Sequence, residues 1–443
     1  MPDRLGGVNQ PSTQTVIDPI VALVIGSGGR EHALALALSK DPQVDAVHVA
    51  PGSPGTDTFA VNHPVDQNDG DAVAALAREI GATLVVVGPE APLVAGVADS
   101  VRAAGIACFG PSKEAAQLEG SKAFAKDVME AAGVPTAAAR VCTTQAELEA
   151  ALDEFGATYV VKNDGLAAGK GVVVTDDRAE ALAHGLDCLS VPGGRVVIED
   201  FLDGPEVSLF AITDGVTSRC FEPAQDFKRV GDLDAGPNTG GMGAYTPLPW
   251  APADIVEQVD QLVIKPTLAE MQRRGTPFAG LLYAGLALTS KGLRVVEFNA
   301  RFGDPETQAL LARLTSPLGQ VLYSAATGRL DETEPLQWGS GAAVVVVMAA
   351  DGYPGTPDKG GRIVLAPDTE VAHTIQAGTA LDAEGHLVAA GGRVLGVVGT
   401  GFDLAAARDA AYAQVAATDF PSGFNRTDIA LKAAHGQITL QEN

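Results

Sequence analysis

The sequence predicts an α/β protein of several domains, with a parallel sheet in its N-terminal part. Short apolar runs typical of buried strands alternate there with segments whose apolar residues recur at helical spacing. The chain has 443 residues, of which 46% are hydrophobic, so it can bury sizeable cores. At about 150 residues per domain, this length indicates roughly three domains.

The first predicted domain covers residues 21–121 and follows a disordered extension over residues 1–20. The extension has one Arg and no apolar stretch, so it does not resemble a signal peptide. Strands are predicted at 21–26, 46–51, 83–90 and 107–110, and helices at 30–40, 71–81 and 93–105. Continuous apolar strands separated by helices indicate a parallel sheet covered on both faces.

The second predicted domain covers residues 122–337. Its first part, at about 134–203, has the order strand, Gly-rich loop, strand, helix, strand, which suggests a small antiparallel lid. A long polar loop is expected at 228–247, followed by a helix at 254–274 and two strands at 280–300. The third domain, 338–443, is expected to be a small β-rich cap with a helix at 404–418.

Charge and cysteine usage exclude several classes of protein. The 30 Lys and Arg residues against 55 Asp and Glu give a net charge of −25, which argues against nucleic acid or an anionic membrane as partner. The longest apolar run, 342–350, is about half the length that a membrane span requires. The four cysteines form no CxxC pair, so neither a zinc site nor a disulfide framework is expected. A cytoplasmic monomer is predicted.

The segment GSGGREHA, residues 26–33, joins a predicted strand to a predicted helix. Its glycines allow close backbone approach, and a helix N-terminus offers N–H groups to a phosphate. A dinucleotide fingerprint would need Gly where Glu31 stands, so an NAD-dependent oxidoreductase is a poor fit. An ordinary tight turn explains the segment equally well.

Two lysines in YVVKNDGLAAGKGVVV, residues 159–174, favour nucleotide binding. Lys162 lies near the end of a strand, and Lys170 lies in a loop with Gly165, Gly169 and Gly171. Two ammonium groups beside a flexible backbone suit a polyphosphate. The spacing differs from that of a P-loop, and a Gly-rich hairpin with solvated lysines is the alternative.

The segment RVVEFNARFGDPETQ, residues 294–308, indicates a metal site. Strand alternation sends Glu297, Asn299 and Arg301 to one face. Two oxygen ligands suit Mg²⁺, and the Arg could clamp a phosphate. An exposed strand with a chance charge pair is the alternative. Weaker signals come from Glu199 and Glu206 around a linker, and from Asp226 and Lys228 in the polar loop.

Taken together, these segments resemble the ATP-grasp ligases. Within them the match is to the phosphoribosylamine–glycine ligase family, from about residue 21 to the C-terminus. The residues that carry it are GSGGREHA, VGPEAPLVAGVAD, QLEGSKAFAKD, DGLAAGKGV, QDFKRVGD, GPNTGGMGAYTP, EFNARFGDPETQ and GGRVL. The resemblance implies an N-terminal pre-ATP-grasp domain, an ATP-grasp core with a mobile lid, and a C-terminal cap.

The resemblance also implies the activity and the roles of individual residues. ATP, glycine and 5-phosphoribosylamine would give glycinamide ribonucleotide, ADP and phosphate through glycyl phosphate, a step of purine biosynthesis. Lys162, Gly169, Lys170, Gly171, Glu199, Phe201, Leu202 and Glu206 would bind ATP, and Glu297 and Asn299 would bind Mg²⁺ or Mn²⁺. Arg301, Asp304 and Lys170 would be catalytic. The other substrates would meet Gly28, Gly29, Arg30, Glu31, Pro89, Glu90, Asp226 and Lys228.

Three departures from the family pattern stand out. Asn163 precedes the DG pair where a small or acidic residue is usual, and PGSPG at 51–55 replaces PGNAG. The strand at 280–288 lacks the third metal carboxylate that many ATP-grasp enzymes carry. Two alternatives stay open: another ATP-grasp carboxylate–amine ligase, and a catalytically silent nucleotide-binding protein.

Overall fold

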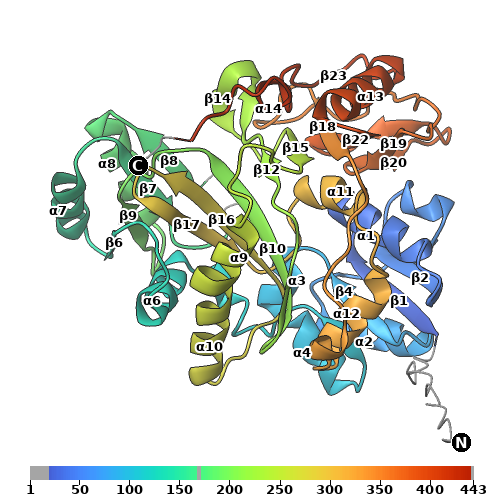
Figure 1. Ribbon diagram of the computed structural model, residues 1–443, viewed down its shortest axis with the longest axis horizontal. Coiled ribbons are helices and arrows are strands. Elements are labelled where there is room, and N and C mark those ends of the chain that lie inside the picture. Colours follow the sequence, from blue (N-terminus) through green and yellow to red (C-terminus); the bar gives the residue numbers. More distant parts are fainter. Residues whose placement is uncertain (1–18, 167–170, 441–443) are drawn as a thin grey trace, which may run out of the picture.

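The computed structural model describes residues 19–166 and 171–440. Lys170, Gly169 and the predicted N-terminal extension up to residue 18 lie outside the described residues. The described chain forms an N-terminal α/β unit, a central antiparallel sheet with a smaller sheet beside it, and a C-terminal unit (Figure 1).

The N-terminal unit is built on a five-stranded sheet in the order β3-β2-β1-β4-β5, and all its strands run parallel. This arrangement confirms the predicted fold class. Its elements are β1 (Ile20–Gly26), α1 (Gly29–Ser39), β2 (Val44–Pro51), β3 (Val61–Asn62), α2 (Gly70–Glu79), β4 (Leu84–Val87), α3 (Glu90–Ala95), α4 (Val97–Ala103) and β5 (Ala107–Phe109). The helix predicted over 93–105 is broken at Gly96, whose φ of 97° ends α3 in the left-handed conformation.

The predicted lid is an antiparallel sheet with its own hydrophobic core. Its strands pair in the order β6-β9-β7-β8, and Leu148, Leu152, Val161 and Ile198 form a core separate from the rest of the molecule. It follows α5 (Gln117–Gly120) and α6 (Lys122–Ala132). It comprises β6 (Ala139–Cys142), α7 (Gln145–Phe155), β7 (Tyr159–Asn163), β8 (Val172–Thr175), α8 (Arg178–Leu189) and β9 (Val196–Glu199).

The central sheet has the order β11-β10-β16-β17, which leaves β17 at an edge facing the lid. Its strands are β10 (Glu206–Asp214), β11 (Ser218–Cys220), β16 (Ala279–Thr289) and β17 (Gly292–Asn299). The helix predicted at 254–274 consists of α9 (Ile255–Val259), a π-helical segment (Asp260–Ile264) and α10 (Lys265–Arg273). The change of hydrogen-bond pattern coincides with Pro266, which has no N–H to donate.

Two further helices connect the central sheet to its neighbours. They are α11 (Glu306–Leu311) and α12 (Leu318–Ala326). Leu318 and Leu322 of α12 pack in one core with Val86 of the N-terminal sheet and Phe210 of the central sheet. The two sheets therefore share a hydrophobic core.

The C-terminal unit contains a sheet in the order β12-β15-β18-β22-β19, with β23 also paired to β18. Its later elements are β18 (Ala342–Ala350), β19 (Ala372–Gln376), β20 (Thr379–Leu381), β21 (Leu387–Ala389), β22 (Arg393–Gly401), α13 (Leu404–Ala417), β23 (Gly423–Phe424) and α14 (Leu431–Ala434). Gly399 allows α13 to lie directly on β22, because a Cβ there would stand 2.3 Å from a carbonyl oxygen of that helix.

The long polar segment at 228–247, predicted as a loop, is partly strand. β12 (Gln225–Asp226) is the edge strand of the C-terminal sheet, and β15 (Gly243–Thr246) lies between β12 and β18. In the chain between them, β13 (Arg229–Gly231) and β14 (Ala235–Asn238) form a hairpin. A segment of the second predicted domain thus joins the sheet of the third.

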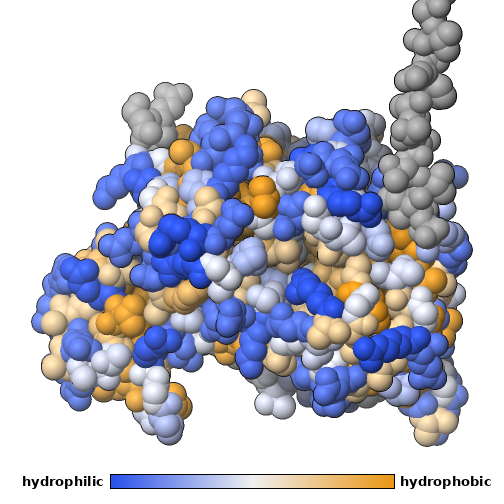
Figure 2. Space-filling view, turned by 90° about the horizontal axis from the view of Figure 1, so that it is seen from below, coloured by the Kyte–Doolittle hydropathy of each residue, from blue (hydrophilic) through white to orange (hydrophobic). Residues whose placement is uncertain are grey.

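No helix in the described part of the chain is long and apolar enough to cross a membrane. On the face drawn in Figure 2, hydrophobic residues lie in small patches among hydrophilic ones.

Candidate active site

A cleft of about 820 Å³ lies where the lid, the central sheet and the N- and C-terminal units meet. It gathers most of the residues that the sequence singled out. They are Arg30, Glu90, Lys162, Gly171, Glu199, Phe201, Leu202, Glu206, Asp226, Lys228, Glu297, Asn299, Arg301 and Asp304. Gly28, Gly29, Glu31 and Pro89 are not among the residues that line it. The cleft is therefore built by segments as far apart in the sequence as Arg30 and Arg393.

Lys162 joins the lid to the central sheet. Its Nζ lies 3.0 Å from a carboxylate oxygen of Glu199 on the neighbouring strand β9 and donates to the carbonyl oxygen of Val296 on β17 at 3.1 Å. Lys126 of α6 lies 3.2 Å from the same Glu199 oxygen. Since Glu199 is buried, its charge is balanced by the two ammonium groups. The result is a fixed pair of cations at the wall of the cleft.

Glu297, Asn299 and Arg301 meet at the end of β17, as strand alternation predicts. An Arg301 nitrogen lies 3.4 Å from the Asn299 Oδ1, and the guanidinium also reaches Glu90 at 3.3 Å and Glu119 at 3.0 Å. Burial opposes the charge of Glu297, but Lys228, Lys162, Lys122 and Arg301 outweigh it and lower its pKa. Glu297 is therefore an ionised carboxylate in the cleft.

The neighbouring strand β16, which has no carboxylate, places Tyr283 opposite Asn299. Its hydroxyl donates to Glu306 at 2.6 Å and lies 2.8 Å from the Ser208 Oγ. Tyr283 and Glu306 both line the cleft. The carboxylate beside Tyr283 is therefore that of Glu306 on α11, not one from β16.

Asp226 and Lys228 form a second charged group with Glu206. Lys228 is ion-paired with Glu206 at the start of β10. Burial opposes the Lys228 charge, but Glu206, Asp226 and Glu297 raise its pKa well above the usual value. Burial raises the pKa of Asp226 to about 7, although Lys228 acts in the opposite direction. This part of the cleft holds a permanent cation beside a carboxyl group that titrates near neutral pH.

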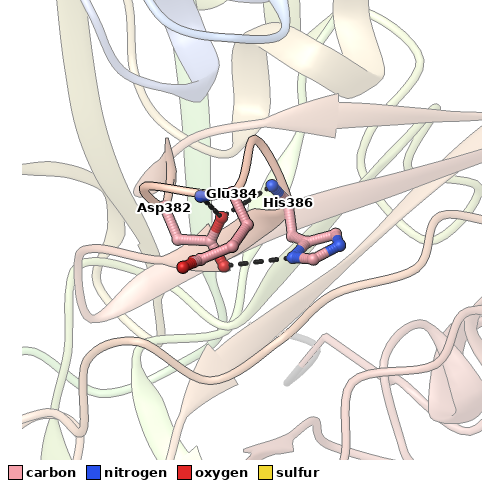
Figure 3. Close-up of side chains that lie close together, drawn as sticks. All are labelled: Asp382, Glu384 and His386. Carbon is pink, nitrogen blue, oxygen red and sulfur yellow. Dashed lines mark hydrogen bonds and ion pairs between the residues drawn. The ribbon is translucent and has the colours of Figure 1, made fainter.

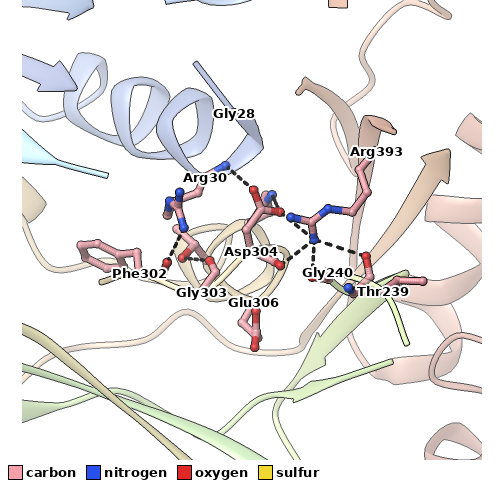
Figure 4. A network of polar contacts seen from close by, with 12 residues as sticks. Gly28, Arg30, Thr239, Gly240, Phe302, Gly303, Asp304, Glu306 and Arg393 are labelled. Carbon is pink, nitrogen blue, oxygen red and sulfur yellow. Dashed lines mark hydrogen bonds and ion pairs between the residues drawn. The ribbon is translucent and has the colours of Figure 1, made fainter. Parts of the chain in front are cut away.

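Asp304 connects the N-terminal, central and C-terminal units (Figure 4). One of its carboxylate oxygens accepts the Arg30 N–H of α1 at 3.1 Å, and the other accepts the Gln308 Nε2 at 3.0 Å and lies 3.4 Å from Arg393 of β22. Burial opposes its charge, but Arg393 and Arg30 lower its pKa. The same Arg393 donates to the carbonyl oxygens of Gly240 at 2.5 Å and of Asp304 at 2.7 Å.

Glu31 stabilises the start of α1 from inside the protein. It is 1% exposed, and its carboxylate accepts the Gly28 N–H at 2.7 Å and the Arg30 Nε at 2.5 Å. A Cβ at Gly88 would stand 2.2 Å from that carboxylate, so the glycines leave room for it. In this geometry Glu31 orients Arg30, whose side chain reaches the cleft.

One further group of acidic residues and a histidine lies away from the cleft, in the hairpin β20–β21 (Figure 3). The Asp382 carboxylate accepts the backbone N–H groups of Glu384 at 3.0 Å and His386 at 2.8 Å, and it lies 3.3 Å from the His386 Nδ1. These bonds close the turn of the hairpin, so we assign the group a structural role.

The sequence did not single out several residues that line the cleft, although they lie in the segments that carry the family resemblance. Lys122, Lys126 and Glu119 stand in QLEGSKAFAKD, Glu306 in RFGDPETQ and Arg393 in GGRVL. The i, i+4 spacing of the two lysines on α6 places both on one helix face and was an available signal. Glu119 and Arg393 reach the site only through the tertiary fold.

Comparison with known proteins finds family models that match most of the chain. Family models match for the phosphoribosylglycinamide synthetase N domain at residues 20–119, its ATP-grasp (A) domain at 120–307 and its C domain at 343–432. A phosphoribosylamine–glycine ligase of Streptomyces coelicolor is 62% identical over 417 residues, which is 93% of this chain and 99% of that protein. The enzyme of that name from Mycobacterium tuberculosis is 57% identical over 423 residues, which is 94% of this chain and 99% of that protein.

Solved structures show the same fold. The phosphoribosylamine–glycine ligase of Thermotoga maritima superimposes with a TM-score of 0.81 at 35% identity, covering 93% of this chain and all of that one. The biotin carboxylase domain of the Hydrogenobacter thermophilus 2-oxoglutarate carboxylase has a TM-score of 0.70 at 16% identity and covers 91% of each chain. The second likeness concerns the fold alone.

Proposed function

The chain belongs to the phosphoribosylglycinamide synthetase family, and from that membership we propose how its cleft performs the reaction. The protein is an ADP-forming ligase that joins glycine to 5-phosphoribosylamine at the expense of ATP, a step of purine biosynthesis. The observation that carries the proposal is the meeting of the Lys162–Glu199 pair with Glu297, Asn299 and Arg301 in one cleft.

ATP is bound between the lid and the central sheet. Lys162, supported by Glu199 and Lys126, binds phosphate oxygens, and Lys170 and Gly169 keep the same predicted role. The backbone of Phe201 and Leu202 meets the adenine edge. Because the Glu199 carboxylate is engaged by two lysines, it holds these cations in place, and the linker that follows it contacts the base. Glu206 receives the ribose hydroxyls.

The residues at the end of β17 fit a divalent cation of the Mg²⁺ or Mn²⁺ type. Glu297 is ionised and Asn299 offers an amide oxygen on the same strand face, and hard cations prefer oxygen ligands. When bound, the cation neutralises charge on the phosphate oxygens. Arg301, held by Glu119 and Glu90, extends this positive field and binds the transferred phosphoryl group.

The reaction proceeds in two displacements. A glycine carboxylate oxygen attacks the γ-phosphorus of ATP, the bond to the bridging oxygen breaks and ADP leaves. The amine nitrogen of phosphoribosylamine then attacks the carbonyl carbon of glycyl phosphate, phosphate leaves and the nitrogen loses a proton. Because acyl phosphates hydrolyse, the lid has to exclude water. Arg30, placed by Glu31 and beside Asp304, faces the phosphoribosylamine.

ADP release tests the substrates and the reaction together. Purified protein is supplied with Mg²⁺, ATP, glycine and phosphoribosylamine made in place from phosphoribosyl pyrophosphate and ammonia, and each substrate is omitted in turn. We expect release to need both substrates, with one glycinamide ribonucleotide formed per ADP. Release with a different acid or amine would instead indicate another ATP-grasp ligase, and ATP binding without any release would indicate a silent nucleotide-binding protein.

The remaining expectations from the sequence stay predictions. We propose a cytoplasmic monomer, which light scattering of the purified protein and cell fractionation test.

A further inference from the structure

The hairpin β13–β14 borders the cleft and holds an unusual backbone conformation at its tip. Arg229, Asp234 and Asn238 of this hairpin line the cleft. Leu233 and Asp234 have φ angles of 56° and 57°, a region that residues other than glycine seldom adopt. Leu233 is 76% exposed, so packing of its own side chain does not explain the conformation.

All the non-glycine residues with positive φ in residues 19–166 and 171–440 belong to one contact. Besides Leu233 and Asp234, the third is Ala430, with φ of 61°, just before α14. The contact joins the hairpin to the segment 425–430, about 195 residues later in the chain, and Figure 1 shows β14 and α14 side by side. Strained backbone persists where surrounding contacts hold it, and it clusters at functional sites.

Arg426 is the centre of this contact. It is 1% exposed, and its guanidinium donates to the Asp428 carboxylate at 2.8 and 2.7 Å, to the Asp234 Oδ1 at 2.9 Å and to the Arg229 carbonyl oxygen at 3.0 Å. The guanidinium carbon also lies 4.9 Å from the centroid of the Phe227 ring. A planar, always charged fork suits this set of partners.

Neighbouring bonds fix the strained tip directly. The Leu233 N–H donates to the Asp428 Oδ2 at 2.8 Å, and the Thr427 N–H donates to the Asp232 Oδ1 at 2.7 Å. Ile429 packs against β15, where a Cβ on Gly243 would stand 2.8 Å from its side chain. The segment 425–430 therefore holds the hairpin tip and the strand that follows it.

Phe227 links this contact to the reaction, because it stands between Asp226 and Lys228 in the chain. Both neighbours line the cleft, and neither Arg426 nor its segment does. We propose that Arg426 is a positioning residue, which holds Asp226 and Lys228 in their reactive placement by clamping Phe227 and the strained hairpin from the C-terminal unit. The proposal rests on the proposed function for the role of these two residues.

Two variants and one control test the proposal in the full-length protein. Arg426→Met removes the clamp, and Asp234→Asn weakens it from the hairpin side without altering the buried segment. Arg329→Met is the control, since Arg329 also stacks on an aromatic ring, that of Tyr323 at 5.9 Å, but bonds Thr327 instead of the segment 425–430 and does not line the cleft. Hydrogen exchange of the Leu233 amide and the kinetics for glycine and phosphoribosylamine are measured on each.

We expect faster exchange at Leu233 and at least about a tenfold loss of kcat/KM in Arg426→Met, because small displacements of positioning groups cost that much or more. Asp234→Asn should show a smaller change in the same direction, and Arg329→Met should leave both readouts near wild type. Adding Leu233→Gly to Arg426→Met should recover part of the activity, because glycine adopts the left-handed conformation without strain. If Arg426→Met does not fold, the Leu233 exchange and the kinetics of Asp234→Asn decide whether the proposal holds.

Three outcomes would overturn the proposal. The first is unchanged Leu233 exchange and unchanged kinetics in the variants that fold. The second is an effect of Arg329→Met as large as that of Arg426→Met, and the third is a kinetic loss with no change in Leu233 exchange. Hydrogen exchange does not depend on turnover, so a clamp that holds the hairpin in a protein without ligase activity would show that the proposed function, and not the clamp, had failed.

Discussion

The guanidinium of Arg301 lies 3.0 Å from the carboxylate of Glu119, although the two residues are 182 positions apart. Glu119 also accepts the Ala300 N–H at 2.7 Å, so one buried carboxylate fixes both the backbone and the side chain at the end of β17. Burial opposes the Arg301 charge, but Glu119 and Glu90 raise its pKa. Glu119 thus holds in place the arginine that we propose binds the phosphoryl group.

Replacing Glu119 by Ala should destabilise the protein and reduce turnover. The change leaves a buried guanidinium short of one partner and the Ala300 N–H without its acceptor, which should cost about 3 kcal/mol. Urea denaturation measures the loss. Glu90→Ala is the matched control, because the Glu90 side chain is 30% exposed and its removal should cost only about 1 kcal/mol. Equal unfolding midpoints for the two variants would contradict the assignment.

Glu297→Ala should reduce ADP release at least about a hundredfold, because one of two side-chain ligands of the proposed cation is lost. The variant should also need more Mg²⁺ for half-maximal rate, and a titration with Mg²⁺ and with Mn²⁺ checks this. The exposed Glu79 of α2 offers a control, since Glu79→Ala removes a carboxylate far from the cleft lining. Activity like that of the wild type in Glu297→Ala would refute the metal assignment.

Lys162→Met should raise the KM for ATP and destabilise the joint between lid and central sheet. The substitution keeps most of the side-chain volume but leaves the buried Glu199 with Lys126 as its single cation, so we expect a loss of about 3 kcal/mol or more. ATP titration of the initial rate and urea denaturation measure the two effects. The exposed Lys359→Met should change neither quantity. An unaltered KM for ATP would show that Lys162 does not bind the nucleotide.

Local rules explain which parts of the site the sequence could predict. Glu297 and Asn299 share a face because strand side chains alternate, and Lys162 and Glu199 stand at the ends of strands with clear apolar runs. Their presence in one cleft follows from the fold that these strands build. For such residues a short stretch of sequence carries most of the information.

The remaining features depend on contacts between distant segments. β12 and β15 have two and four residues, too few to show a period, and they become strands by pairing in the sheet that β18 extends. Arg393 reaches Asp304 across 89 positions, and Glu119 reaches Arg301 only because α5 packs at the end of β17. No local pattern in the sequence specifies these contacts.

Asp226→Asn should raise the melting temperature at pH 8 and leave it nearly unchanged at pH 4. Burial raises the Asp226 pKa to about 7 in the folded protein, whereas an unfolded Asp titrates near 4. Between these values the folded state binds the extra proton, so the stability that this group contributes is complete below about pH 4 and is lost as the pH rises through about 7. Asn is a neutral mimic of the protonated side chain, and it avoids the cost of a buried charge at high pH.

Calorimetry at pH 4 and pH 8 compares the variant with wild type and with the exposed Asp409→Asn. We expect a difference in melting temperature from wild type for Asp226→Asn alone, and we expect it to grow with pH. A melting temperature of Asp226→Asn below that of wild type at pH 8 would contradict the prediction. The same substitution should remove the rise of kcat/KM through about pH 7 if the ionised Asp226 takes part in the reaction, because the variant has no proton to lose there. Asp226 would then stabilise the fold when it is protonated but act in the reaction when it is ionised. The reaction would therefore require the less stable charge state of a side chain that β12 of the C-terminal sheet holds in the cleft.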